Sequence, residues 1–169
     1  LSVGLATTQN KLSQSQVQLE NIYKRNYYDL VDSVNTADTN ISKLMASSNE
    51  TYQAKMLREL SQSAKEMQDS IASLPLQGDG VLQSVRFINQ MSGYTQILEE
   101  KLANGGQLSV EDVDTLSQMH EVITQMKQHL NKMSYQMFED YDILENSFPS
   151  NDSYGQFSGD YSQINEDGT

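Results

Sequence analysis

The sequence contains no cysteine and no tryptophan, only two prolines, and 11 lysine and arginine residues against 23 aspartates and glutamates. Without cysteine the chain can form neither a disulfide nor a thiolate metal site, and it has no thiol nucleophile. The formal net charge is −12. This charge disfavours nucleic acid as a partner, because a phosphate-binding surface needs clustered lysines and arginines.

A long hydrophobic run is also missing. The opening residues 1–6, LSVGLA, are mostly apolar, but a helix that crosses a bilayer needs about 20 such residues. An acidic surface would be repelled by anionic lipid headgroups. We therefore expect membrane attachment to come only from an amino-terminal anchor that precedes this sequence, with residues 1–6 interpreted as the tail of that anchor.

The residues that are present favour helix. Few breakers interrupt the chain, and its 169 residues are enough for one domain. Apolar residues recur at alternating steps of three and four, which places them on one stripe of a helix. The first stripe contains Leu12, Leu19, Tyr23, Tyr27, Leu30, Val34, Ala37, Ile41 and Leu44. It predicts a helix over residues 6–46, roughly 60 Å long at 1.5 Å per residue.

Two further helices follow from capping and breaking signals. Ser47 and Glu50 have the S-x-x-E spacing of a capping box, which predicts the start of a second helix, and Pro75 should end it. A turn at residues 78–80 leads to a third helix that the glycines of residues 104–106 should close. Its predicted core stripe contains Leu82, Val85, Ile88, Ser92, Thr95, Leu98 and Leu102.

The fourth helix should begin with a second capping box, formed by Ser109 and Asp112, and continue to about Leu144. The four helices predict an all-α fold, an antiparallel four-helix bundle over residues 1–146. The first and fourth helices exceed the middle two and should project together as a two-helix stalk. Residues 147–169 lack lysine and arginine and are predicted to form an acidic flexible tail or a linker to carboxy-terminal domains outside this chain.

No constellation of residues indicates catalysis, a metal or a cofactor. His120 and His129 are nine residues apart, so they point to opposite sides of a helix, and neither has a glutamate three positions earlier as in di-iron bundles. No G-x-S-x-G elbow or glycine-rich phosphate loop occurs. We therefore predict that the chain is not an enzyme. The methionines from Met119 onwards are interpreted as core rather than as a docking groove.

Candidate partner contacts come from aromatic residues off the core stripe. Tyr28 lies beside the stripe of the first helix, and Tyr154, Phe157 and Tyr161 are spaced through the tail. Such side chains can bury an apolar ring while keeping a polar group in contact with water. We also expect the exposed stalk to favour a homodimer, because a partner chain is the simplest way to bury its apolar stripe.

Four segments resemble the amino-terminal domain of the YpeB family of germination proteins from spore-forming bacteria. The longest is LENIYKRNYYDLVDSVNTADTNISKLM, at residues 19–45. SIASLP at 70–75, FINQMSGYTQIL at 87–98 and GGQLSVEDVDTL at 105–116 follow in the same order. The resemblance covers about residues 19–145. It implies a protein tethered to the inner spore membrane that faces outward and whose partner is a cortex-lytic enzyme of the SleB type.

Our hypothesis is a non-catalytic scaffold or regulatory domain that stabilises, localises or restrains such an enzyme. The alternative is an extracytoplasmic sensor domain, because four-helix bundles with long first and last helices also bind small ligands in membrane receptors. The acidic tail favours the first hypothesis, since the last helix of a receptor should instead run straight into a second membrane span.

Overall fold

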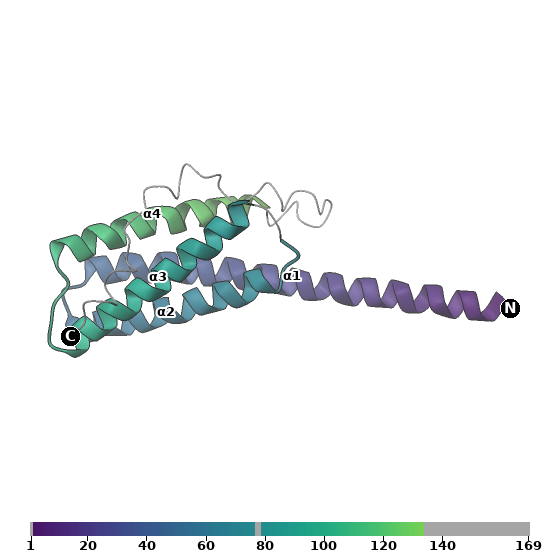
Figure 1. Ribbon diagram of the computed structural model, residues 1–169, viewed down its shortest axis with the longest axis horizontal. Coiled ribbons are helices and arrows are strands. Elements are labelled where there is room, and N and C mark those ends of the chain that lie inside the picture. Colours follow the sequence, from purple (N-terminus) through teal and green to yellow (C-terminus); the bar gives the residue numbers. More distant parts are fainter. Residues whose placement is uncertain (1, 77–78, 134–169) are drawn as a thin grey trace.

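The computed structural model describes residues 2–76 and 79–133, which form four α-helices. They are α1 (Ser2–Ala46), α2 (Glu50–Ala72), α3 (Asp79–Ala103) and α4 (Val110–Met133). Each helix runs antiparallel to the one before it (Figure 1). α1 packs against both α2 and α4, and α3 packs against α2. The predicted all-α antiparallel four-helix bundle is therefore confirmed.

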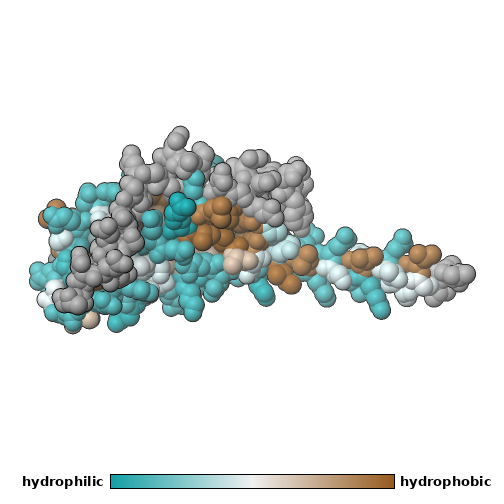
Figure 2. Space-filling view, viewed as in Figure 1, coloured by the Kyte–Doolittle hydropathy of each residue, from teal (hydrophilic) through white to brown (hydrophobic). Residues whose placement is uncertain are grey.

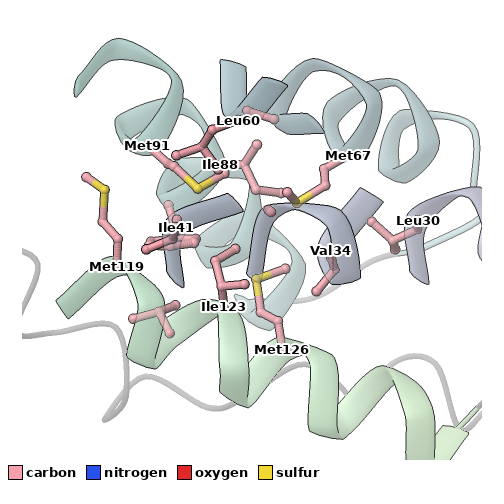
Figure 3. Packing of buried hydrophobic residues seen from close by; sticks show 14 of the residues in the cluster. Leu30, Val34, Ile41, Leu60, Met67, Ile88, Met91, Met119, Ile123 and Met126 are labelled. Atoms are coloured by element: carbon pink, nitrogen blue, oxygen red, sulfur yellow. The ribbon is translucent and has the colours of Figure 1, made fainter. Parts of the chain in front are cut away.

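The core is an apolar cluster to which all four helices contribute. In Figure 3, side chains of α2 and α3 meet those of α1 and α4 across the centre of the bundle. From α1 it takes Tyr27, Leu30, Val34, Ala37, Ile41 and Leu44, which are at most 1% exposed. Met119 and Met126 of α4 are 0% and 1% exposed. Their prediction as core residues is confirmed, whereas Met133 and Met137 contribute no described side chain.

The predicted stripe of α3 was wrong at Leu82 and Ser92, whereas Ile88 is fully buried as expected. Leu82 is 65% exposed, whereas its neighbour Val81 is 8% exposed. In the same way Met91 is fully buried where Ser92 was expected. Two apolar series one residue apart fit this part of the sequence, and the packed fold buries Phe87 and Met91 of one together with Ile88 of the other.

The start of α2 also differs from the prediction. The N-cap is Asn49, whose side-chain oxygen accepts a hydrogen bond from the Tyr52 amide at 2.9 Å. Ser47 Oγ instead accepts a hydrogen bond from the Asn49 amide at 3.1 Å, within the turn that precedes the helix. Asn and Ser cap helices equally well, so the residue directly before Glu50 takes the role and Ser47 supports the turn.

The junction between α3 and α4 was predicted correctly. Gly105 has a φ of 80° and its amide donates to the Leu102 carbonyl, while the Gly106 amide donates to the Lys101 carbonyl. This pair of bonds is a Schellman motif. The Asp112 amide donates to Ser109 Oγ at 3.2 Å, and the Ser109 amide donates to Asp112 Oδ2 at 2.7 Å. The predicted capping box is therefore present, with both bonds formed.

α1 is much longer than the helices packed beside it. It has 45 residues against 23 in α2 and 25 in α3, and its amino-terminal part extends beyond the bundle (Figure 1). Every residue from 4 to 22 is exposed, and Tyr27 is the first buried one. We call residues 4–22 the projecting segment and residues 27–46 the packed segment. The expected contribution of the fourth helix to the stalk, after Met133, and the tail at 147–169 lie outside the described residues.

Within the described part of the chain, no helix combines the length and the apolar character needed to cross a membrane.

Candidate functional site

Asp38 is the centre of a polar cluster that joins α1 to α4. Its Oδ1 accepts a hydrogen bond from Thr124 Oγ1 at 3.0 Å, and its Oδ2 lies 2.7 Å from Lys127 Nζ. His120 Nε2 lies 3.1 Å from Oδ1. Burial of the Asp38 side chain opposes ionisation, but the hydrogen bonds from Lys127 and Thr124 outweigh it and lower the pKa below the usual aspartate value. The ionised carboxylate therefore ties the two helices together.

The same cluster brings a serine, a histidine and an aspartate together without forming a catalytic triad. His120 Nε2 lies 2.9 Å from Ser42 Oγ, so both Ser42 and Asp38 contact the same ring nitrogen. A triad needs the acid on one nitrogen and the nucleophile on the other. In addition, Ser42 Oγ donates its proton to the Asp38 backbone carbonyl at 2.9 Å. The arrangement is suited to holding α4 on α1, not to activating a nucleophile.

A second polar cluster joins α3 to α4 around Asp112. Beyond its capping bonds to Ser109, this carboxylate accepts from Tyr94 Oη at 2.9 Å and lies 2.5 Å from Lys101 Nζ. Burial opposes ionisation of Asp112 as well, and its bonds with Lys101, Ser109 and Tyr94 outweigh burial and lower its pKa. From the sequence the residue was identified only as part of a cap, because its partners on α3 become neighbours through folding.

Tyr27 and Tyr28 mark the point where α1 leaves the bundle. The Tyr27 hydroxyl donates to the Leu130 carbonyl of α4. Burial raises the pKa of the Tyr27 phenol, and the neighbouring Tyr28 raises it further by a smaller amount. Tyr28 packs edge-on against Tyr27, with ring centroids 5.9 Å apart, and is 45% exposed. The predicted candidate contact at Tyr28 is thus on the surface, at the base of the projecting segment.

Two adjoining hollows lie over α2 and α3. The larger, of about 590 Å³, is lined by Glu50, Thr51, Ala54, Arg58, Glu99, Glu100, Leu102 and Ala103. The second, of about 540 Å³, shares Arg58 and Glu99 with it. Both are open to solvent and edged by charged side chains, whereas small-molecule sites usually enclose most of their ligand. This surface therefore fits another protein better than a small ligand.

The other candidate contacts, Tyr154, Phe157 and Tyr161, lie outside the described residues. Of the two histidines, His120 lies at the α1–α4 contact, whereas His129 is exposed and its Nδ1 lies 2.9 Å from the Gln125 carbonyl of its own helix. Among residues 2–76 and 79–133, no group of three or more His, Asp or Glu side chains is arranged to hold a metal ion.

These features define the class of protein. It is an antiparallel helical bundle with a projecting first helix, whose described polar clusters connect its own helices. The chain belongs to the YpeB N-terminal family, which it matches over residues 11–141, more than three quarters of its length. It is thus a domain of a spore germination protein, and the family is not a known catalytic one. No curated protein and no solved structure matches the chain.

Proposed function

We propose that this domain is a non-catalytic scaffold through which a membrane-tethered germination protein stabilises, localises or restrains a cortex-lytic enzyme of the SleB type. The observation that carries the proposal is the family match over residues 11–141. The tether is an amino-terminal anchor in the inner spore membrane, with the bundle facing outward. The lytic chemistry belongs to the partner enzyme.

The polar side chains support this role. Among the described residues, Asp38 and Asp112 form the shortest ion pairs and have lowered pKa values, and both hold helices together. Carboxylates bound in this way make the bundle rigid. They are not available as the general acid or base that a hydrolase would need. A rigid bundle with open, charged hollows over α2 and α3 presents a surface on which a partner protein can dock without reorganising the scaffold.

The direct test is a calorimetric titration of the purified chain with its cognate SleB-type enzyme. The complete extracytoplasmic region of the germination protein serves as the control. We expect both to bind. Binding by the complete region alone would assign recognition to other domains and refute docking on this bundle. In spores, normal accumulation and control of the enzyme after deletion of this domain would refute the scaffold role.

Two tyrosines form a matched pair for locating the contact. Tyr28 is 45% exposed at the base of the projecting segment, and Tyr52 is 38% exposed in the first turn of α2, at the opposite end of the bundle. If Tyr28 contacts the enzyme, Tyr28→Ala should weaken binding about tenfold or more, as for a buried aromatic anchor. Under the same hypothesis Tyr52→Ala should leave the affinity unchanged, whereas docking on the larger hollow, lined by the adjacent Thr51, would reverse the two results. Simultaneous replacement of Tyr154, Phe157 and Tyr161 by alanine tests the tail in the same titration.

A further inference from the structure

The projecting segment carries leucines at a strict seven-residue spacing. Leu5, Leu12 and Leu19 are 69%, 59% and 49% exposed, and no described residue covers them. Figure 2 shows apolar side chains at intervals along this helix. Seven residues are two turns of a supercoiled helix, so the three side chains form one continuous seam. Written as a heptad, the leucines occupy position d, and Gln9 and Gln16 occupy position a.

We propose that two copies of the chain pair through this seam as a parallel, in-register coiled coil over residues 5–23. The pairing requires no enzyme partner and goes beyond the scaffold role. It would bring the amino termini of the two copies side by side and leave each bundle outside the contact.

The glutamines favour a second copy in parallel orientation. In a parallel pair, Gln9 faces Gln9 and Gln16 faces Gln16, and each amide has both a donor and an acceptor to offer its twin. In an antiparallel pair, position a faces position d, so each glutamine would lie opposite a leucine with its amide unsatisfied. Polar residues at position a are known to specify register in this way, at some cost in stability.

The charges also permit two copies to approach. Although the chain carries a net charge of −12, the projecting segment contains one cation, Lys11, and one anion, Glu20. Lys11 falls on the outer side of the heptad. Glu20 flanks the seam, where the facing residue of the second copy is Ser15. The seam therefore brings no like charges together, whereas contact between the two acidic bundles would.

The helix itself needs a partner. Most helical stability in proteins comes from tertiary packing of an apolar face, and this segment is rich in Gln, Ser, Thr and Asn, of which Ser, Thr and Asn are weaker helix formers. Pairing supplies the tertiary contact that such a helix lacks. Tyr23, which is half-buried at the edge of the bundle, occupies the last a position and joins the seam to the core.

The test is sedimentation equilibrium of the whole chain over about a hundredfold range of concentration, since self-association must depend on concentration. We expect the mass to rise from that of one chain toward that of two. Leu12→Asp should weaken the dimer about a hundredfold or more, because it places a charge in the seam of both copies. The matched control is Val17→Asp. Val17 is 54% exposed and lies at an outer position of the heptad.

Monomers at every concentration would overturn the proposal. The leucines of the projecting segment would then have to be buried by residues 134–169 of the same chain. If Val17→Asp weakened the dimer as much as Leu12→Asp does, the dimer contact would not be the leucine seam.

Disulfide cross-linking tests the orientation, because the chain has no cysteine of its own. Leu5→Cys and Leu19→Cys variants should each cross-link with themselves, since in-register d positions bring two β-carbons within disulfide range. Val17→Cys should cross-link far less and serves as the control. Cross-linking only in a mixture of Leu19→Cys and Gln9→Cys chains, which join a d position to an a position, would show an antiparallel pair and overturn the proposed orientation.

Discussion

The two parts of α1 have the same secondary structure and similar apolar stripes, yet their burial is opposite. In the packed segment, Leu30, Val34 and Ile41 are completely buried. In the projecting segment, Leu5 and Leu12 are 69% and 59% exposed. The spacing of three and four runs through both, although Gln9 and Gln16 fill alternate places of the stripe in the projecting segment. The comparison shows that an apolar stripe predicts which face of a helix will pack, but the neighbouring helices decide whether it does.

The cause of the difference is the length of the neighbours. α2 ends at Ala72, and Asn26 of α1 donates to the Ser73 carbonyl just after that end. α4 reaches the same level, where Leu130 accepts from the Tyr27 hydroxyl. Beyond this point no described helix lies beside α1 (Figure 1). The packed segment belongs to the cooperative core, and the projecting segment should add little to the stability of a monomer.

The largest expected difference in stability is between leucine-to-alanine substitutions in the two segments. Leu30→Ala removes a completely buried side chain and should lower the free energy of unfolding by about 2–5 kcal/mol, because it leaves a cavity. Leu12→Ala, measured at low protein concentration, should change it by less than about 0.5 kcal/mol. Urea denaturation followed by circular dichroism gives both values. An equal loss for the two variants would mean that the same chain covers the projecting segment, and would break the comparison.

The next effect concerns acidic residues of the two segments. Asp38→Ala removes a carboxylate that binds Lys127 and Thr124 of α4 and should cost about 1–2 kcal/mol, reduced because the lysine is partly exposed. Glu20 is exposed in the projecting segment, and Glu20→Ala should cost less than about 0.5 kcal/mol. The thermal midpoints of the two variants provide the comparison, and a Glu20 effect as large as that of Asp38 would contradict it.

The contribution of Asp38 should also depend on pH. Its pKa is lower in the folded chain than the usual value, so the stabilisation is complete above the unfolded pKa of about 4 and is lost as the pH falls through the folded pKa. The difference in unfolding free energy between wild type and Asp38→Ala should therefore shrink when the pH is lowered from about 7 to about 3. A difference that grows toward acid pH would refute this assignment.

The smallest effect is expected at the turn that ends the packed segment. Asn49→Ala removes the N-cap of α2 and should cost about 1 kcal/mol. Ser47→Ala removes a bond within the turn and should cost less. A larger loss at Ser47 would restore the capping box predicted from the sequence. Differential scanning calorimetry of the two variants distinguishes these outcomes.

Much of the fold could be predicted because its signals are local. The carboxy-terminal end of α1, the Ser109–Asp112 box and the glycine-terminated end of α3 all depend on residues within a few positions of one another. The predictions that failed depended on choices between near equivalents: Val81 or Leu82 in the core, and Asn49 or Ser47 as the cap. In each pair both residues have suitable chemistry, so local pattern alone could not separate them.

The sequence by itself determined the four helices, their order and the membership of the family. Only the tertiary structure decided that Asp38 meets His120 and Lys127, that Asp112 reaches Tyr94 and Lys101, and that the bundle ends at Tyr27. The physical reason is how far apart in the sequence the interacting residues lie. Helix formation and capping depend on contacts between residues a few positions apart, whereas the polar clusters join residues on different helices, which become neighbours only when the bundle packs.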